Sequence, residues 1–353
     1  MAEKRKQSFP ALCVIAILLV FLLNLPVKAA AAQEVILGGE HYPADSTELS
    51  LSGLSPEEVE AAIPQFPNLR KIILTDTGAD DETLDALNRK YPDIDIVWTV
   101  MIGKIPVRTD AAWFYVAKEK TLPTGKDLEK LRYCTEMIAV DVGHLRVSEC
   151  SWLESMPHVK YLILADTRIT DLTPLSNLKE LIYLELFNMQ LKDYSPLLGC
   201  TALQDLNISN THADPEPLSH MTWLHNLFWY QGLSDPATKE AVRLLPKQLP
   251  QTNVMLDVTG KISSPWRSLP NYYVFRDIIG AQFLNQTAIT RNWGQEDAQK
   301  ILACDRHREP FSGEVLAEIV KYRIENDIPI IGAKDAERAQ ILYQTLRDSR
   351  LYD

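Results

Sequence analysis

The sequence has few cysteines, and their spacing excludes the common metal frameworks. None of its five cysteines lies two residues from another, whereas a structural zinc site needs paired sets of closely spaced ligands. The stretch CDRHRE, from Cys304 to Glu309, holds residue types that can bind metal but offers a single set. We therefore predict that the protein holds no metal and no cofactor.

Motifs that carry catalysis are also missing. The sequence contains no H-E-x-x-H helix motif, no phosphate-binding loop and no G-x-S-x-G elbow. His144, with Asp141 and Asp166 near it, is the one group of residues that a hydrolase mechanism could use. No nucleophile accompanies it, and a histidine among strand acids is more often a polar surface residue. We predict that the protein is not an enzyme.

Positive charge is in short supply. Lysine and arginine number 36 against 47 acidic residues, which gives a net charge of −11. The chain beyond residue 32 is more acidic still, because the first 32 residues are themselves basic. A strongly acidic chain repels a polyanion, so we predict that nucleic acid is not a partner.

Only one long apolar run is present, from Ala11 to Leu23. It follows a basic start and precedes four consecutive alanines, which is the order found in a secretory signal. We predict that residues 1–32 are a signal peptide and that the mature protein is secreted, extracellular or associated with the cell surface. In the alternative interpretation the run is an uncleaved anchor, which would be the only contact with a membrane. Cleavage is favoured because the run is shorter than the roughly 20 residues of a membrane span.

The middle of the sequence repeats at a nearly constant interval. Equivalent aliphatic residues follow one another at spacings of 22, 22, 22 and 21 residues. A frame of the form L-x-x-L-x-L-x-x-N-x-L with a period of about 20 to 29 residues is typical of leucine-rich repeats. Each repeat supplies a strand and a return segment, and repeats stack because one alone cannot bury its apolar side. The equivalent residues are Val140, Leu162, Leu184, Leu206 and Leu227.

This pattern predicts an α/β leucine-rich repeat solenoid, with parallel strands on the concave face and helical or irregular return segments. Residues 134–260 are the expected array, and residues 33–133 are expected to be diverged repeats with a strand insertion. Residues 261–353 change to helical spacing, and we predict a C-terminal cap or α-helical region there. Such a cap would cover the last apolar layer of the array.

The diverged repeats carry local signals of their own. Ser55 before Pro56 is typical of a helix N-cap followed by proline at the first helical position. The acidic run Asp80–Glu82 also predicts a helix start; a calcium site is the less favoured alternative, because the spacing of an EF-hand loop is absent. After Asp95, alternating apolar and polar residues around Gly103 predict a hairpin or strand excursion.

The cysteines of the array fall at core positions of the repeat. Cys134 and Cys200 occupy the position that Met156 and Leu178 fill in neighbouring repeats. This equivalence favours buried thiols, while a disulfide remains an alternative in an exported protein.

Two stretches carry a family resemblance, YLELFNMQLKDYSPL and DLNISNTHADPEPLSHMTWLHNL. They resemble the leucine-rich repeats of exported bacterial proteins, including the internalin type, and the flanking YPDIDIVWTV resembles uncharacterised proteins of Gram-positive bacteria. The resemblance implies a curved solenoid that binds a protein partner without catalysis. The sequence departs from the pattern at the usual asparagine position, so its turns must satisfy their backbone groups in another way. The residues at that position are Leu145, Thr167, Met189, Thr211 and Gly232.

Strand residues that point away from the core are predicted to line the concave face and to bind a protein or a glycan. Aromatic side chains are common anchors of interfaces, and the acids among them favour a basic or hydroxyl-rich ligand. Alternatively, these rings cover one another or pack under the C-terminal region. A second hypothesis makes the protein a structural component of the cell envelope whose C-terminal region forms the functional contact. The candidate binding residues are Asp141, His144, Tyr161, Asp166, Tyr183, Glu185, Phe187, Asp205, Asn207, Phe228 and Tyr230.

Overall fold

The computed structural model describes residues 34–116, 122–230, 236–256, 266 and 269–273. Internal contacts divide the chain into two compact units, Met1–Ile96 and Val97–Asp353, which are taken in turn below. The predicted signal peptide, Cys304 and most of the predicted C-terminal region lie outside the described residues. The predicted boundaries at residues 133 and 260 stay predictions.

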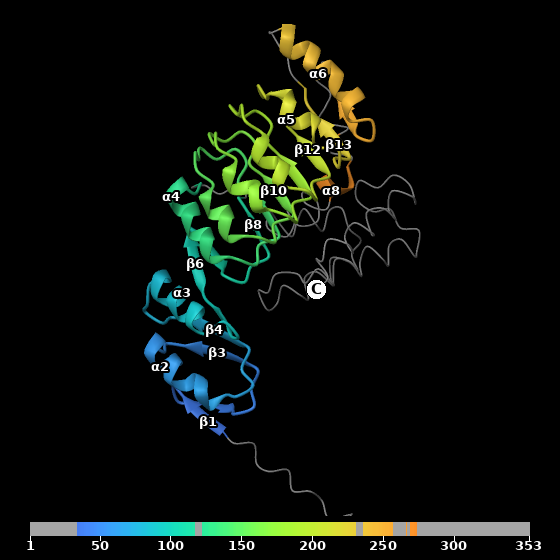
Figure 1. The fold of residues 1–353 in the computed structure, drawn as a ribbon. Helices are drawn as coiled ribbons and strands as arrows, with labels where there is room; N and C mark the ends of the chain where they lie inside the picture. Colours follow the sequence, from blue (N-terminus) through green and yellow to red (C-terminus); the bar gives the residue numbers. More distant parts are fainter. Residues whose placement is uncertain (1–33, 117–121, 231–235, 257–265, 267–268, 274–353) are drawn as a thin grey trace, which may run out of the picture. The chain divides into compact units, whose positions relative to one another are not determined.

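The first unit contains short strands, two α-helices and one 3₁₀ helix (Figure 1). A small antiparallel pair precedes a sheet in which β3 and β4 are parallel and β5 follows β4 at the edge. The helices are the return segments between these three strands. The strands are β1 (Glu34–Leu37), β2 (Glu40–Pro43), β3 (Glu48–Ser52), β4 (Lys71–Thr75) and β5 (Asp95–Val97), and the helices are α2 (Pro56–Ala62), the 3₁₀ helix η1 (Ile63–Gln65) and α3 (Asp81–Lys90).

Both helix starts of this unit are capped as the sequence predicted. Ser55 and Glu58 form a capping box, in which each side chain accepts a hydrogen bond from the backbone of the other. The carboxylate of Asp80 accepts a 2.9 Å hydrogen bond from the backbone N–H of Thr83. Hydrogen bonding from the Thr83 side chain, together with this backbone bond, lowers the pKa of Asp80. The acidic run therefore has a structural role at the start of α3.

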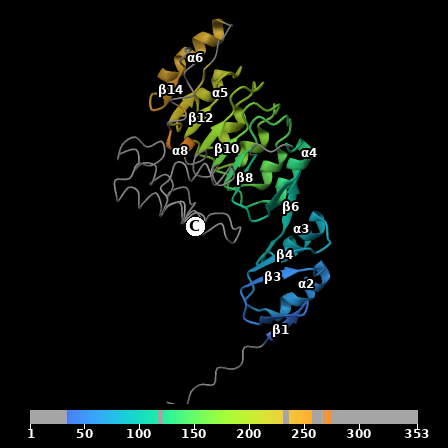
Figure 2. The same cartoon turned by 180° about the vertical axis from the view of Figure 1, so that it is seen from behind.

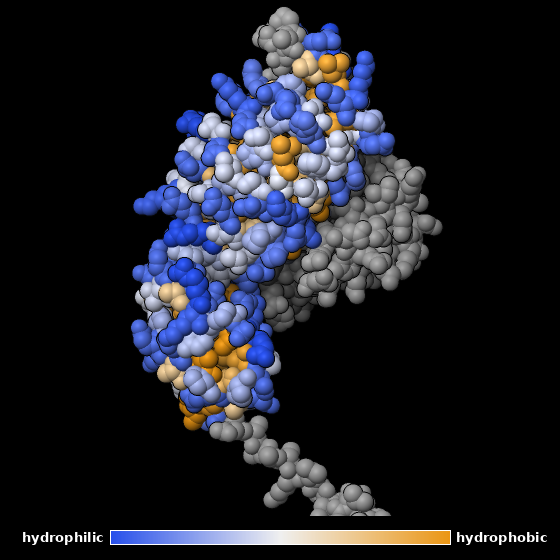
Figure 3. All heavy atoms as spheres, viewed as in Figure 1, coloured by the Kyte–Doolittle hydropathy of each residue, from blue (hydrophilic) through white to orange (hydrophobic). Residues whose placement is uncertain are grey.

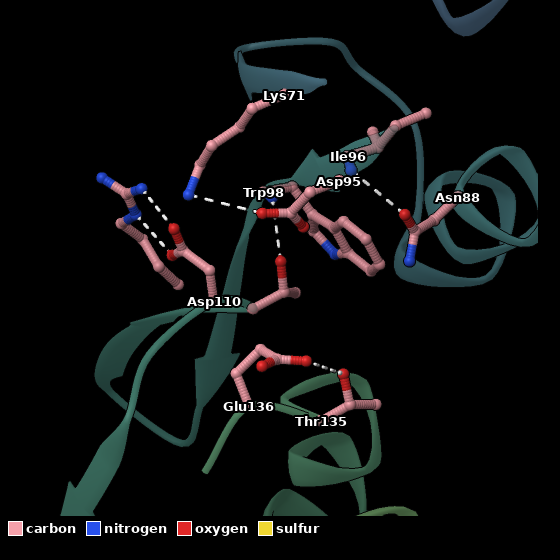
Figure 4. A network of polar contacts seen from close by, with 10 residues as sticks. Lys71, Asn88, Asp95, Ile96, Trp98, Asp110, Thr135 and Glu136 are labelled. Carbon is pink, nitrogen blue, oxygen red and sulfur yellow. Dashed lines mark hydrogen bonds and ion pairs between the residues drawn. The ribbon is translucent and has the colours of Figure 1, made fainter. Parts of the chain in front are cut away.

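A hairpin follows in the second unit and confirms the predicted strand excursion. Strands β6 (Thr99–Ile102) and β7 (Ile105–Arg108) pair antiparallel around Gly103, whose φ of +64° suits glycine. Figure 4 shows the polar contacts beside it: the backbone N–H of Trp98 donates to the Thr109 hydroxyl. The guanidinium of Arg108 binds both carboxylate oxygens of Asp110, at 2.7 and 2.8 Å. These bonds hold the second hairpin strand before the chain enters the array.

The array is a parallel sheet of seven strands in sequence order (Figure 1). Val140, Leu162, Leu184, Leu206 and Leu227 lie opposite one another in consecutive strands, so the predicted repeat register is confirmed. The chain thus has the leucine-rich repeat fold. The strands are β8 (Trp113–Tyr115), β9 (Ala139–Asp141), β10 (Tyr161–Ile163), β11 (Tyr183–Glu185), β12 (Asp205–Asn207), β13 (Asn226–Phe228) and β14 (Asn253–Met255).

Short helices form the return side of the array. Most are 3₁₀ turns of a few residues, and those of neighbouring repeats pack on one another. Asp171 and Asp193 each open one of these segments by accepting a hydrogen bond from the backbone two residues on. The return elements are α4 (Gly125–Leu128), η2 (Glu129–Tyr133), η3 (Ser151–Ser155), η4 (Thr173–Asn177), η5 (Ser195–Gly199), α5 (Pro215–Ser219) and α6 (Pro236–Gln248).

The last return segment differs from the preceding ones because it is a longer helix. Figure 2 shows α6 near β14, with which it is in contact. The sequence of α6 and β14 parallels that of α3 and β5 in the first unit, and in both places a helix leads into a strand at the edge of its sheet.

Between strands and return segments lies a core of aliphatic side chains and thiols. Cys134, Cys150 and Cys200 are buried and free, which confirms the core interpretation for these three. Burial raises the pKa of the Cys150 and Cys200 thiols to about 12. Such thiols are protonated and unreactive at neutral pH.

The surface of the array in the view of Figure 3 is mainly hydrophilic. Large exposed hydrophobic side chains, among them Leu198 on η5 and Leu244 on α6, belong to separate elements. Within the described ranges, no helix is both long and apolar enough to traverse a lipid bilayer. The accessible features that repeat along the array are therefore polar.

Candidate functional site

A row of four polar residues lies along the edge of the sheet that is formed by the carboxyl ends of the strands β9 to β12. His144, Asp166, Asn188 and Asn210 each come just after a strand, and their side chains are exposed. All four have a left-handed backbone, with φ between +57° and +65°. Among residues with a side chain, Asn, Asp and His tolerate this conformation best. We call this row the edge ladder.

The side chains of the edge ladder bind one another from repeat to repeat. Asn210 Nδ2 donates to Asn188 Oδ1 at 2.7 Å, and Asn188 Nδ2 donates to Asp166 Oδ1. The other oxygen of Asp166 lies 2.9 Å from His144 Nδ1. The result is a chain of hydrogen bonds across four repeats, open to solvent along its length.

Two aromatic residues lie next to the edge ladder. Phe187 is half-buried, and its ring meets the imidazole of His144 edge-on, with centroids 6.1 Å apart. Tyr230, also half-buried, follows β13 and accepts the backbone hydrogen bond of Asn210 through its carbonyl. The edge therefore combines polar groups with rings that keep some accessible surface.

The sequence contained a signal for this ladder that the repeat frame hid. The frame directed attention to Leu145, Thr167, Met189 and Thr211, where relatives of the repeat carry asparagine. One position earlier, residues that tolerate a positive φ recur every 22 residues. The expectation that the turns satisfy their backbone differently is met there: the N–H groups of His144, Asp166 and Asn188 each donate to a carbonyl of the next repeat, at 2.8 to 2.9 Å.

The strand positions behind the edge ladder are polar but buried. Asp141 Oδ1 accepts from the N–H of Gly143 at 2.9 Å, and Asn207 Oδ1 accepts from the N–H of Ser209 at 3.0 Å. A side chain at position 143 would be crowded, because a Cβ there would lie 2.9 Å from Ile163 Cγ2. These contacts shape the turns that carry the ladder.

The centre of the concave face is covered by residues near the C-terminal end of the described chain. The indole of Trp266 stacks on Tyr183, with centroids 5.1 Å apart and planes inclined by 30°, and meets Phe228 edge-on at 5.0 Å. The indole N–H donates to Tyr183 Oη at 3.0 Å, and that hydroxyl donates to Glu185. Burial, with the adjacent Glu185 carboxylate, raises the pKa of Tyr183 well above its usual value.

Asp205 lies beside this aromatic cluster and is buried with it. One of its carboxylate oxygens accepts from Asn226 Nδ2 at 2.8 Å and the other from Asn271 Nδ2 at 2.9 Å. Burial raises the pKa of Asp205, and these two hydrogen bonds oppose the shift because they favour the charged form.

The predicted binding residues thus fall into two groups. His144 and Asp166 are exposed, and Phe187 and Tyr230 are half-buried. The other predicted residues were expected to be exposed, and that expectation is corrected: two aromatic rings lie under Trp266, Tyr161 and Tyr183 cover one another, and the polar groups are hydrogen-bonded within the fold. Their part in binding stays a prediction. The buried residues are Asp141, Tyr161, Tyr183, Glu185, Asp205, Asn207 and Phe228.

The described residues contain no cluster of three or more His, Cys, Asp or Glu side chains that could hold a metal ion. His144, the residue that a hydrolase mechanism would use, is bonded to Asp166 and lies on an open edge. Its neighbours place it in a repeating surface pattern.

Comparison with known proteins finds likeness in fold at low identity. No family model matches the chain, and no curated protein matches it. Among solved structures, internalin C2 of Listeria monocytogenes is 23% identical over 43% of this chain and 76% of its own, with a TM-score of 0.33. Internalin F of the same organism is 20% identical over 70% and 69%, with a TM-score of 0.37.

A leucine-rich repeat chain from another solved complex is similar as well. A chain of the octameric complex of latrophilin 3, Unc5D and FLRT2 is 17% identical over 56% of this chain and 73% of its own, with a TM-score of 0.30. Because identities and TM-scores are this low, the fold assignment rests on the strand register of the chain itself.

Proposed function

We propose that this chain is a non-catalytic, secreted or cell-surface leucine-rich repeat protein that binds a protein or glycan partner along its concave sheet. The accessible part of the site is the edge ladder together with Phe187 and Tyr230. The observation that carries the proposal is the unbroken row of exposed hydrogen-bonding groups from His144 to Asn210.

The chemistry of this edge favours a polar partner with apolar faces. The ladder offers amide, carboxylate and imidazole groups at nearly constant intervals, because adjacent strands lie about 4.8 Å apart. The exposed faces of Phe187 and Tyr230 supply anchors of the kind that contribute most to interfaces. An extended peptide fits this arrangement best, since its own polar groups recur at short intervals.

The binding proposal is tested by capture of secreted and envelope proteins, and of an array of glycans, on the immobilised full-length chain. The variant Phe187→Ala/Tyr230→Ala removes both rings and should weaken binding by about 2 kcal/mol, or roughly 30-fold. The matched control is Tyr42→Ala/Tyr91→Ala, which removes two half-buried rings of the first unit. Thermal melts establish that each variant is folded.

Each result decides between the hypotheses. Loss of a captured partner by the first variant alone supports the proposed edge. Full retention of the partner by that variant overturns it, and retention that depends instead on residues 274–353 favours the envelope-component hypothesis. Export is tested separately by deleting residues 1–32, which should leave the protein inside the cell; export without them would contradict the predicted signal.

A further inference from the structure

The tryptophan on the concave face does not belong to a repeat. Trp266 follows the last strand of the array and lies 83 residues from Tyr183 in the sequence. Even so, its side chain is only 3% exposed. Two rings hold the indole from different strands, Tyr183 of β11 and Phe228 of β13, and its N–H has a partner in the Tyr183 hydroxyl. A buried indole N–H usually has such a partner, and here the Tyr183 hydroxyl supplies it.

A second contact joins the chain near Trp266 to β12, the strand between β11 and β13. Asn271, five residues after Trp266, donates to the carboxylate of Asp205 on β12. Both partners are nearly inaccessible, with Asn271 6% and Asp205 2% exposed. The segment therefore binds three successive strands through one aromatic and one amide side chain.

The chemistry of this contact is that of a binding site more than of a core. The strand positions beneath the segment include Glu185, Asp205 and Asn207, all buried. Buried carboxylates make an interface weaker than apolar side chains of similar size would. In addition, Asn271 Oδ1 is buried and has no hydrogen-bond partner among the described residues. The face is thus built for a specific contact that can dissociate.

We propose that the concave face at β11–β13 is a peptide-binding site and that Trp266 and Asn271 act as its intramolecular ligand. The external ligand that it accepts is a peptide with a tryptophan followed five residues later by a side-chain amide. Such a peptide and the chain's own segment compete for Tyr183, Phe228 and Asp205. This inference goes beyond the edge ladder, which remains accessible whether or not the segment is bound.

The test compares peptide binding by the full chain with its own ligand intact and removed. The probe is a fluorescent peptide of residues 264–274, SPWRSLPNYYV, and the readout is fluorescence anisotropy. The variant Trp266→Ala/Asn271→Ala should bind the probe at least tenfold more tightly than the unmodified chain does, because the site is vacant. The same probe with alanine in place of its tryptophan should not bind.

Two further variants make the result decisive. Trp223→Ala is the matched control, because it removes another indole of the array, whose N–H donates to the carbonyl of Cys200. Trp266 and Asn271 should still occupy the site in this variant, so the probe should bind no more tightly than to the unmodified chain. Asn271→Asp keeps the shape of the side chain but places a carboxylate against Asp205, and it should also open the site. Thermal melts accompany each measurement.

The outcomes separate the two roles of the segment. Probe binding by a folded double variant or by folded Asn271→Asp supports the inference. If both fold and neither binds the probe more tightly than the unmodified chain, the face is not a peptide site. If neither folds, the segment is part of the structural core and the inference is overturned.

Discussion

The side-chain amide of Asn210 donates a 2.7 Å hydrogen bond to the side-chain oxygen of Asn188, the residue 22 positions earlier. Both residues have a left-handed backbone, with φ of +57° and +58°. The position therefore makes two demands at once, a conformation that few side chains tolerate and a group that can bond to the neighbouring repeat. Asparagine satisfies both.

These two demands can be separated by substitution at Asn188. Asn188→Gly and Asn188→Ala both lose the side-chain bonds, but only glycine adopts a positive φ without strain. The left-handed conformation costs alanine roughly 1 to 2 kcal/mol, which the greater freedom of glycine in the unfolded chain offsets in part. We expect Asn188→Ala to have a free energy of unfolding about 1 kcal/mol lower than that of Asn188→Gly, measured by urea unfolding. Equal stability, or the reverse order, would contradict the conformational explanation.

The repeat register predicts how much the central leucines contribute to the free energy of unfolding. Leu184 is fully buried and lies between Leu162 and Leu206 in the sheet. Leu184→Ala should lower the free energy of unfolding by about 2 to 5 kcal/mol, because it leaves a cavity. The control Leu198→Ala alters a side chain that is 37% exposed, and its effect should be much smaller. Similar losses for the two variants would show that the core is assigned wrongly.

Asp205 gives the protein a predictable dependence on pH. An unfolded aspartate titrates near about 3.9, and burial raises the pKa of Asp205 in the folded state. Between the two values the folded protein holds more protons than the unfolded chain, so the free energy of unfolding falls as pH rises through this window. Asp205→Asn lacks this contribution.

The measurement is urea unfolding of both proteins from about pH 4 to about pH 7. The difference in stability, unmodified chain minus variant, should decrease with rising pH and then level off above the folded pKa. Carboxylates with a lowered pKa, such as Asp171 and Asp193, change stability in the opposite direction, but they are common to both proteins and cancel. A constant difference would rule out a raised pKa for Asp205.

The array thiols should be inert in the folded protein. Burial raises the pKa of Cys150 and Cys200 to about 12, far above the roughly 8.5 of a free cysteine. In a Cys13→Ser/Cys304→Ser background, Ellman's reagent at about pH 8 should react only after denaturation. Rapid reaction of the native protein would show that a core thiol is accessible, and one reactive thiol instead of three after denaturation would show a disulfide.

The repeat frame, the hairpin at Gly103 and the helix caps could be read from the sequence because each depends on neighbouring residues or on a short period. Val140 and Leu162 pair as their 22-residue spacing predicts. The covering of Tyr183 by Trp266 has no such signal, since the two residues are 83 apart and Trp266 lies outside any repeat. The exposure of side chains on the concave face was therefore overestimated, because it depends on contacts with Trp266, which is distant in the sequence.

The edge ladder was predicted only in part. His144 and Asp166 were among the predicted binding residues, but the hydrogen-bonded row that they form with Asn188 and Asn210 was not, because the repeat frame places asparagine at the adjacent position. At the asparagine position of the frame, Leu145 and Met189 are buried apolar side chains. The polar side chains that bond between repeats lie one residue earlier, where the backbone is left-handed. A search for Asn, Asp or His at the period of the leucines would have found it.

The in-register pairing of the strands also limits how such a protein can change in length during evolution. Loss or duplication of one 22-residue unit preserves every remaining pair, and it shortens or extends the sheet by about 4.8 Å. Units around β9 and β10 can vary in this way without harm to the rest. The strands β11, β12 and β13 cannot, because Trp266 reaches across the first and third while Asn271 bonds to the second. The distance between an indole and an amide in one short segment thus fixes the number of repeats beneath it.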